Sequence, residues 1–434
     1  MDPIALAALV LVAGVAICIA LAVPIAIGIG LSSFLAAVIL LDVERAALVS
    51  AQKLFTGINS FTLLAIPFFV LAGVLMNNGG IAARLIDAAK VVVGRMPNSM
   101  AQTNVVANSL FGAVSGAAVA AAAAVGTVMT PRMRQEGYER NFAAAVNVSS
   151  APSGMLIPPS NTFIVYSLVS GSSVAALFMA GVGPGLVWML ACMIVVAILG
   201  RRYGGGGDEV RPTAREGLVT IWRAVPSLLM IVIVVGGILA GVFTATESSA
   251  IAVVYCLVLG FAYRAIKVAD LPGILLDAAR TTAIIMLLVG VSTVLSFVMS
   301  FAHIPQAVSD SLLGLSSNSV VILLIMMGIL LAVGTFMDPT PAILIFTPIF
   351  LPIVESFGVD PLHFGTMMVY NLCVGVITPP VGNVLFVGAR VAGLRIEPVV
   401  AKMLWFFAAI VVGLFVVVFV PALSMWLPTV LGLT

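Results

Sequence analysis

Runs of about twenty apolar residues recur along this chain, and they constrain its fold more than any other feature, because a helix that crosses a bilayer takes roughly that length. Lipid offers no hydrogen-bond partners, so the backbone of such a run must bond to itself, as it does in a helix. Only 8% of the 434 residues are charged, whereas a soluble domain has about a quarter. The sequence therefore predicts an all-α polytopic membrane protein.

Uninterrupted apolar segments of spanning length are expected to form simple membrane helices. They lie at 4–22, 24–41, 61–79, 175–199, 225–244, 248–265, 281–302, 318–333 and 404–427. The first of them lacks the positively charged flank of a cleaved signal peptide, so we expect it to be retained. The segment 81–95 carries its charges on one side, which fits either a helix along the membrane surface or an ordinary loop helix.

Other apolar segments are interrupted by Gly, Pro, Ser and Asn. They lie at 100–131, 141–171, 338–354 and 364–390. Such interruptions are tolerated at membrane depth only where protein or a water-filled cavity satisfies the freed backbone groups. These segments predict re-entrant hairpins and broken helices.

The chain carries the same short strings in both halves. A Thr-Pro pair at Thr130 and at Thr347 is followed by GMLIPP from Gly154 and by GVITPP from Gly375. Matching interruptions in two halves are the best sequence pointer to the binding site of a transporter built from repeats. The repeats are inverted if each holds an odd number of crossings.

The most polar stretch, GGGGDEVRP from residue 204, lies between these halves. We therefore predict a first repeat at 1–203, a linker at 204–222 and a second repeat at 223–434. Basic residues gather at 201–223 and at 264–280, so the positive-inside rule places the linker on the cytoplasmic face.

The double prolines are expected to break two helices and to open a site. Proline removes an amide hydrogen and restricts the residue before it, so no helix continues through such a pair. The broken ends offer carbonyls to a cation and amides to an anion, and hydroxyl and amide side chains beside them add oxygens that suit a hard cation. An alternative is that these side chains only cap the helix ends. The residues concerned are Pro158, Pro159, Ser160, Asn161 and Thr162 in the first half and Thr378, Pro379, Pro380, Gly382 and Asn383 in the second.

Two glycine-containing breaks are expected to form hairpin tips. The first runs from Gly112 through Ser115 to Gly116, and the second comprises Gly334, Thr335, Phe336, Met337 and Asp338. An acid in an apolar region is costly unless it is paired, protonated or bound to a cation. Asp338 therefore predicts either a cation contact or a helix N-cap before a proline.

Several function classes lack support in the sequence. The net charge of +2 and the absence of a Lys/Arg block argue against nucleic-acid binding. No H-E-x-x-H, G-x-S-x-G or P-loop motif is present, so an enzyme is not expected. The four cysteines have no C-x-x-C spacing, which favours small buried hydrophobes over a metal site. No cofactor is expected beyond coupling ions.

The strings that carry these features resemble a known family. They are SGAAVAAAAAVGTVMTPRM, IPPSNTFIVYSLVSGSSVAALFMAGVGPG and DPTPAILIFTPIFLPIVESFGVDPLHFGTMMVYNLCVGVITPPVGNVLFVGARVAG, together with the early AIPFFVLAGVLMNNGGIAARLI. They are similar to the large membrane (permease) subunit of tripartite ATP-independent periplasmic (TRAP) transporters. The resemblance covers essentially the whole chain.

The resemblance implies an elevator-type secondary transporter of the ion-transporter superfamily in the bacterial inner membrane. Two hairpins and two broken helices would form its mobile part. Sodium would drive the uptake of an organic acid, such as a C4-dicarboxylate or a sialic acid. A periplasmic substrate-binding protein would deliver that acid, and a small membrane subunit would be the second partner. Carried over to this sequence, the tips and breaks named above would enclose the sodium ions and the substrate carboxylate.

The first hairpin departs from the family pattern. Many relatives continue from Ser-Gly with another serine and then a small polar or acidic residue, whereas this chain has Ala117, Ala118 and a run to Ala124. Two alternatives also stay open. One is a stand-alone sodium/anion symporter of the same superfamily that works without a binding protein. The other, from a different class, is a membrane scaffold or an intramembrane enzyme.

Overall fold

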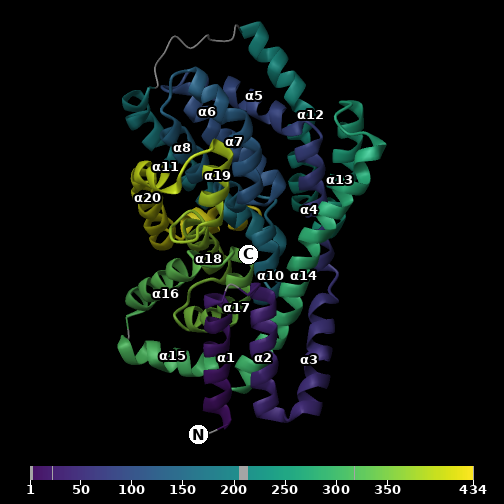
Figure 1. The fold of residues 1–434 in the computed structure, drawn as a ribbon, viewed down its shortest axis with the longest axis vertical. Coiled ribbons are helices and arrows are strands. Elements are labelled where there is room, and N and C mark those ends of the chain that lie inside the picture. The colour runs from purple at the N-terminus through teal and green to yellow at the C-terminus, as the bar shows by residue number, and fades with distance from the viewer. Residues whose placement is uncertain (1–2, 22, 205–213, 317, 434) are drawn as a thin grey trace.

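The computed structural model describes residues 3–21, 23–204, 214–316 and 318–433, and their regular structure is helical throughout. Seven helices in these ranges are long and apolar enough to cross a membrane. This confirms the all-α polytopic class. Figure 1 shows the N-terminus at the lower end of the molecule and the C-terminus near its middle.

The first half of the chain contains eleven α-helices and two short 3₁₀ turns. They are α1 Pro3–Ala20, α2 Ile25–Leu41, α3 Val43–Ile58, η1 Thr62–Leu64, α4 Ala65–Asn78, α5 Ile81–Val93, α6 Ser99–Ser115, α7 Ala118–Gln135, α8 Arg140–Ser150, α9 Ser153–Leu156, α10 Asn161–Ser170, α11 Val174–Leu199 and η2 Gly200–Tyr203.

The second half follows a similar order. It consists of α12 Ala214–Leu239, α13 Ala245–Ala262, η3 Val268–Asp270, α14 Leu271–Phe301, α15 Ile304–Leu315, α16 Ser319–Gly334, α17 Pro339–Ser356, α18 Pro361–Gly375, α19 Asn383–Ala392, α20 Ile396–Phe419 and α21 Ala422–Val430. In each half two helices precede a long arm, which is α3 with α4 in the first half and α14 in the second. A shorter helix and a hairpin follow the arm. Each half then has a broken helix (α8 to α10, or α18 and α19) and a long closing helix (α11 or α20).

The two repeats are inverted and interlocked. Hairpin 1 (α6 and α7) lies in the upper part of Figure 1, whereas hairpin 2 (α16 and α17) lies in the lower part. The first helices of each half pack on the arm of the other half, because α13 contacts α4 while α2 contacts α14. The hairpins therefore approach the centre of the molecule from opposite ends.

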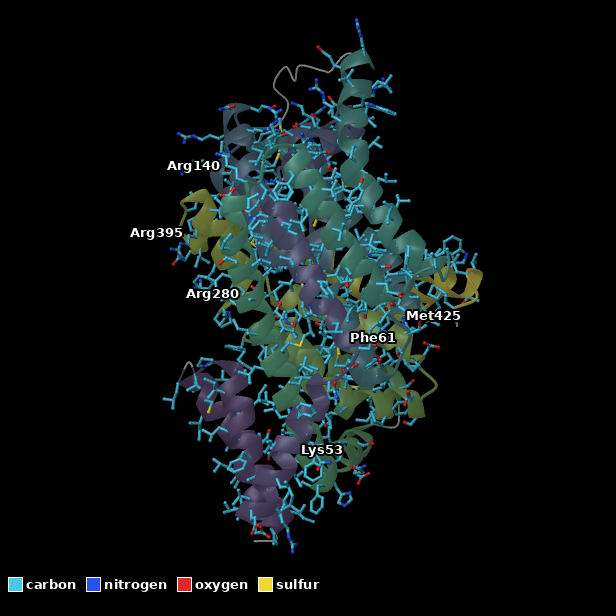
Figure 2. The ribbon with its side chains drawn as sticks, turned by 90° about the vertical axis from the view of Figure 1, so that its right-hand side faces the viewer. Lys53, Phe61, Arg140, Arg280, Arg395 and Met425 are labelled. Carbon is cyan, nitrogen blue, oxygen red and sulfur yellow. The ribbon has the colours of Figure 1, made fainter. Side chains whose placement is uncertain are left out.

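The arm of the first repeat differs from the expected span at 61–79. Val43–Ile58 forms a further helix, and it meets the segment Thr62–Asn78 at a bend of 64°. The expectation missed α3 because its polar residues lower its hydropathy, among them Lys53. Figure 2 labels Lys53 on α3 and Phe61 at the bend. The ammonium of Lys53 lies 5.4 Å from the centroid of the Phe297 ring on α14, which joins the two arms.

Three other boundaries differ from the sequence prediction. The span expected near 404–427 is present as α20, but it begins and ends earlier, at Ile396–Phe419, and α21 begins after Pro421. Residues 205–213 of the expected linker lie outside the described residues, and residues 214–222 are helical. The segment 318–333, expected as a simple span, is α16, the first helix of hairpin 2.

The segment expected at 81–95 is a helix, α5, over Ile81–Val93. Its apolar side is buried, including Ile81 and Leu85, and it packs on α6 and α12. Asp87 on its polar side pairs with Arg132 of hairpin 1 at 3.1 Å. The helix α5 therefore connects hairpin 1 to α12.

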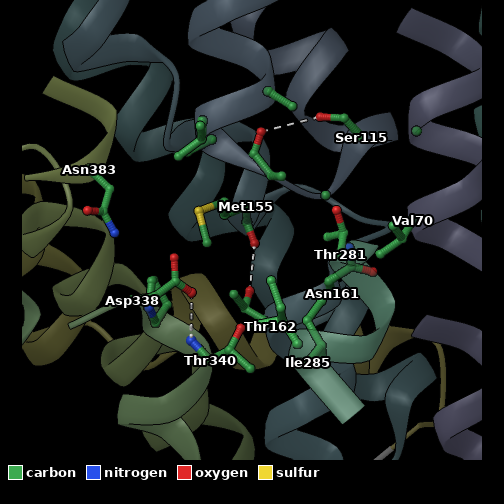
Figure 3. Close-up of a pocket in the computed structure, with 18 of the residues that line it drawn as sticks. Val70, Ser115, Met155, Asn161, Thr162, Thr281, Ile285, Asp338, Thr340 and Asn383 are labelled. Atoms are coloured by element: carbon green, nitrogen blue, oxygen red, sulfur yellow. Dashed lines mark hydrogen bonds between the residues drawn. The ribbon is translucent and has the colours of Figure 1, made fainter. Parts of the chain in front are cut away.

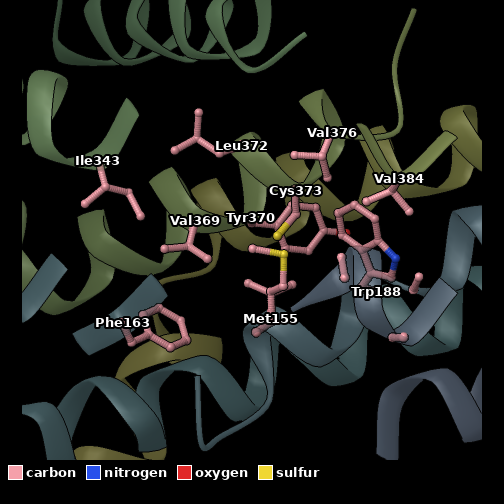
Figure 4. Packing of buried hydrophobic residues seen from close by; sticks show 14 of the residues in the cluster. Met155, Phe163, Trp188, Ile343, Val369, Tyr370, Leu372, Cys373, Val376 and Val384 are labelled. Carbon is pink, nitrogen blue, oxygen red and sulfur yellow. The ribbon is translucent and has the colours of Figure 1, made fainter. Parts of the chain in front are cut away.

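The core lies between the broken helices and the closing helices (Figure 4). Trp188 of α11 and Tyr370 of α18 are fully buried, and their ring centroids are 4.9 Å apart. The polar atom of each side chain has a hydrogen-bond partner. Trp188 Nε1 donates to the Ser149 carbonyl at 2.9 Å, and the Tyr370 hydroxyl donates to the Ile410 carbonyl at 3.1 Å. Such anchored aromatic side chains fix α8, α11, α18 and α20 against one another.

Candidate functional site

Both double prolines fall in gaps between helices, as the sequence predicts. Pro158-Pro159 separates α9 from α10, and Pro379-Pro380 separates α18 from α19. The peptide bond within each pair is cis. The second part of each broken helix begins at an asparagine, Asn161 or Asn383.

Each hairpin lies against the broken helix of its own repeat through a pair of glycines. A Cβ atom on Gly154 would lie 2.2 Å from the Gly112 Cα, and one on Gly375 would lie 2.5 Å from the Gly334 Cα. No real side chain fits at such distances, so the backbones touch directly. The same device in both repeats brings each hairpin tip beside the gap that the prolines open.

A cavity of about 750 Å³ lies where the tips and gaps meet (Figure 3). This volume is within the usual range for small-ligand sites, about 300–1,000 Å³. Six predicted site residues line the cavity: Ser115, Gly116, Asn161, Thr162, Asp338 and Asn383. The structure thus brings together residues from both hairpins and both broken helices.

Four helices begin at the wall of this cavity. The lining includes Ala118 of α7, Thr162 of α10, Thr340 of α17 and Val384 of α19, all in first turns. Among the described residues no side chain caps the N-terminus of α7, α10 or α19. First-turn amides without helical acceptors and the positive ends of helix dipoles favour an anion.

Asp338 takes one of the two roles that the sequence left open, the helix N-cap. One carboxylate oxygen accepts a hydrogen bond from the Thr340 amide at 3.2 Å, which caps α17. The other carboxylate oxygen points away from Thr340 toward the cavity in Figure 3. The side chain is therefore held by the cap while half of the carboxylate stays available to a ligand.

The remaining predicted residues lie behind the wall. Ser160 is buried, and its hydroxyl donates to the Met155 carbonyl and lies 2.7 Å from the Thr162 hydroxyl. The hydroxyls of Thr335 and Thr378 donate to carbonyls of their own helices at 2.7 and 2.6 Å. These three hydroxyls shape the breaks from within.

The remaining glycines and prolines of the prediction also lie away from the cavity wall. The Gly382 amide donates to the Thr335 carbonyl at 3.3 Å, which ties the second tip to the second break. Gly334 makes the close backbone approach described above. The four prolines Pro158, Pro159, Pro379 and Pro380 stand in the gaps. None of these residues is among the described residues that line the cavity.

Close contact also joins the first tip to the first break. Gly116 has φ +63°, and a Cβ atom there would lie 2.7 Å from Asn161 Nδ2. Ala117 and Ala118 line the cavity with methyl groups. At this tip, polar contacts to a ligand would come from Ser115, from backbone groups and from the neighbouring Asn161.

Sequence reasoning missed the other wall of the cavity. Asn77 and Asn78 of α4 line it, as do Asp277 and Thr281 of α14. The string MNNGG and an acid within a long apolar helix were signals for these positions. The cavity is therefore bounded by hairpins and broken helices on one side and by the two arms on the other.

The charges around the cavity are unbalanced. Asp277 and Asp338 line it, and no Lys or Arg does so among the described residues. Arg280 lies 3.9 Å from Asp277, but both side chains are largely exposed, so this pair contributes little. Backbone amides are the main groups in the wall that favour an anion, and carboxylates are the main groups that favour a cation.

Comparison with known proteins gives a consistent picture. A family model described as the tripartite ATP-independent periplasmic transporter, DctM component, matches residues 12–423. The chain is 52% identical to the uncharacterized protein YgiK of Salmonella typhimurium over 92% of each chain. It is 38% identical to the C4-dicarboxylate TRAP transporter large permease protein DctM of Pseudomonas aeruginosa, over 88% of this chain and 90% of that protein.

A more distant relative and a solved structure extend this picture. The sialic acid TRAP transporter large permease protein SiaM of Vibrio cholerae is 35% identical over 87% of this chain and 89% of its own length. The crystal structure of the Alcanivorax borkumensis YdaH transporter, described as having an unusual topology, matches with a TM-score of 0.62. That match covers 91% of this chain and 90% of the other at 14% identity, and it concerns the fold alone.

Proposed function

We propose a function from the premise that this chain belongs to the DctM family of tripartite ATP-independent periplasmic transporters. Membership makes it a multi-pass permease of the bacterial inner membrane and a transporter rather than an enzyme, as the sequence predicted. What it carries, what drives it and how it moves are the proposal.

The proposed substrate is an organic acid. Relatives are named for C4-dicarboxylates, sialic acid and 2,3-diketo-L-gulonate. The observation that carries this proposal is the convergence of four helix N-termini on one cavity, three of them without a side-chain cap. Their amides suit a carboxylate, and Asn161 and Asn383 stand at two of these termini to donate further hydrogen bonds.

The proposed coupling ion is sodium. An anionic substrate would add to the charge of Asp338 in a wall without a described basic side chain. Bringing like charges together away from bulk water is costly unless a cation enters with them. The free carboxylate oxygen of Asp338 and the side-chain oxygens of Ser115, Asn161 and Asn383 are the ligands that we assign to this role. Substrate and sodium would therefore bind together.

The proposed movement is of the elevator type. Each hairpin touches the broken helix of its own repeat through backbone contacts. The two repeats pack together through α7 on α19 and α10 on α17, so the four pieces can move as one body. The arms form the opposite wall, where Gly73 of α4 lets the Ser115 backbone approach: a Cβ atom on Gly73 would lie 3.2 Å from the Ser115 carbonyl oxygen. A smooth contact of this kind suits sliding of one body along the other.

The proposed partners are a small membrane subunit and a periplasmic substrate-binding protein, as the family name implies. The exposed apolar side chains of α12, such as Leu218 and Trp222, lie on the outer surface, where they meet lipid or another membrane protein. The binding protein would deliver the acid to the cavity.

The experiment is uptake into proteoliposomes that contain this chain and its small subunit. Labelled acids named for the relatives are presented with a purified binding protein, and the sodium gradient is switched on or off. We expect uptake only when the binding protein and the sodium gradient are both present. Uptake without the binding protein would instead indicate the stand-alone symporter, and uptake unchanged by replacing sodium with potassium would refute sodium coupling.

A further inference from the structure

Four polar side chains form a buried cluster behind hairpin 1, away from the cavity wall. Asn104 and Asn108 come from α6, while Asn147 and Ser150 come from α8. Each is at most 1% exposed, and none lines the cavity within the part of the chain that the structure describes. We call these four residues the asparagine cluster.

Four oxygen atoms of the asparagine cluster surround one nitrogen atom. Asn108 Nδ2 lies 2.9 Å from Asn104 Oδ1, 3.0 Å from Asn147 Oδ1, 2.8 Å from Ser150 Oγ and 3.2 Å from the Asn147 carbonyl oxygen. An amide nitrogen has two hydrogens, so it can serve only two acceptors fully. The Asn147 carbonyl also accepts from the Ala151 amide at 3.2 Å, so three side-chain oxygens share the two hydrogens of Asn108.

Other hydrogen bonds fix two of these oxygens as acceptors. The Asn147 amide nitrogen donates to the Ala122 carbonyl at 2.8 Å, which turns Asn147 Oδ1 toward Asn108. The Ser150 hydroxyl donates to the Val146 carbonyl at 2.7 Å, which leaves its lone pairs for Asn108. The nitrogen of Asn104 lies 3.4 Å from the Met133 sulfur, so its oxygen also faces the centre.

The oxygen of Asn108 itself has no hydrogen-bond partner among the described residues. A buried carbonyl without a donor is destabilising. Turning the amide over would not relieve this cost, because it would place a fifth oxygen among the four. A cation at the centre would be coordinated by all five oxygens together.

The second repeat shows that the fold does not require this cluster. Positions are matched by counting back from Gly112 and Gly334 along the hairpins, and from Gly154 and Gly375 along the broken helices. The cluster residues Asn104, Asn108, Asn147 and Ser150 then correspond to Met326, Leu330, Met368 and Asn371. Asn371 donates to the Met327 carbonyl at 2.7 Å, and its oxygen, like that of Asn108, has no hydrogen-bond partner among the described residues. The same architecture is thus built with mostly apolar residues, so the asparagine cluster has a purpose other than packing.

We propose that the asparagine cluster binds one sodium ion, at the place now taken by the Asn108 amide group. Five neutral oxygens suit a hard monovalent cation, because a divalent ion would keep its full charge uncompensated in the interior. On binding, the Asn108 side chain withdraws and turns its oxygen inward. Asn108 lies seven residues, about 10 Å along the helix, before the hairpin tip at Ser115.

This site is separate from the ions proposed in the cavity. It does not require that sodium drives transport, because an ion there would hold α6 and α8 together whatever the coupling. Through these helices it would fix the position of the first hairpin tip. Hairpin 2 has no such cluster at the matching positions, so an ion there would act on hairpin 1 alone.

The test is the number of radioactive sodium ions bound per chain at equilibrium, measured on the purified full-length protein in lipid nanodiscs. Asn108→Leu, which copies Leu330 of the second repeat, should bind one sodium ion fewer than the wild type. The matched control is Asn371→Leu, a buried asparagine outside the cluster, which should bind as many as the wild type. An unchanged number in a folded Asn108→Leu protein overturns the proposal.

A second variant keeps the proposal testable if Asn108→Leu does not fold. Asn108→Asp adds a negative charge among the oxygens, so it should raise sodium affinity and make thermal stability depend strongly on sodium. Stability equally low in sodium and in choline would overturn the site. Sodium-independent transport together with one bound ion fewer in Asn108→Leu would refute the proposed coupling and leave this site standing.

Discussion

The backbone contact between Gly112 and Gly154 can be tested by adding a single methyl group. In Gly154→Ala the new Cβ atom would lie 2.2 Å from the Gly112 Cα and 2.4 Å from its carbonyl carbon. Ordinary carbon contacts are about 3.5 Å, so the two backbones must separate by roughly 1 Å. No rotamer change can relieve the clash, because both partners are main chain.

The expected cost of Gly154→Ala lies at the upper end for overpacking, about 3 kcal/mol. A gain of about 1 kcal/mol from helix propensity offsets part of it. Gly375→Ala should behave alike, since it meets Gly334 at 2.5 Å, whereas Gly328→Ala on the same hairpin has nothing within 4 Å and should be neutral or slightly stabilising. The assays are the unfolding temperature in detergent and substrate uptake. Wild-type stability and uptake in Gly154→Ala would refute the contact.

Three further substitutions test the cavity itself. Gly116→Ala should impair substrate binding, because its Cβ atom would lie 2.7 Å from Asn161 Nδ2 and the residue would keep φ +63°; unchanged binding in an equilibrium titration would contradict this. Asp338→Asn should retain the hydrogen bond to the Thr340 amide, and so the fold, while sodium-dependent binding falls; equal sodium dependence would argue against a cation at Asp338. Gly73→Val should slow uptake more than it weakens equilibrium binding, because the added side chain obstructs the moving hairpin; wild-type uptake would argue against sliding at this contact.

Features that depend on local backbone chemistry could be predicted from the sequence. The breaks at Pro158 and Pro379 were found because proline stops a helix in any surroundings. The hairpin tips at Gly116 and Asp338 could be predicted because each lies in a glycine-containing break of its apolar segment. The repetition of both devices was the strongest sign of a shared site.

Features that depend on the packing of distant elements could not be predicted. Ser160 and Thr378 were expected at the site because their hydroxyls lie beside the breaks; they do not line the cavity, and backbone carbonyls in the same segments accept their hydrogen bonds. Asp277 and Thr281 line the cavity only because α14 crosses beside it. Hydropathy locates such a helix but does not say which of its faces meets the site.

The cluster around Asn108 illustrates the same limit. Two asparagines spaced four residues apart within α6 were a visible signal, since such side chains share one face of a helix. Their partners Asn147 and Ser150 lie on another helix, and only the hydrogen-bond geometry shows that four oxygens meet at one nitrogen. The number of oxygens around Asn108 therefore depends on how α6 and α8 pack, and the sequence does not show it.

The central claim is that the cavity binds an organic acid and sodium together. The most direct measurement is an equilibrium titration of the purified permease complex with its acid, first in sodium chloride and then in choline chloride at the same ionic strength. The account predicts clearly tighter binding in sodium, with the difference largely lost in Asp338→Asn. Equal affinity in both salts would contradict the claim that the cation balances the charge of the bound acid.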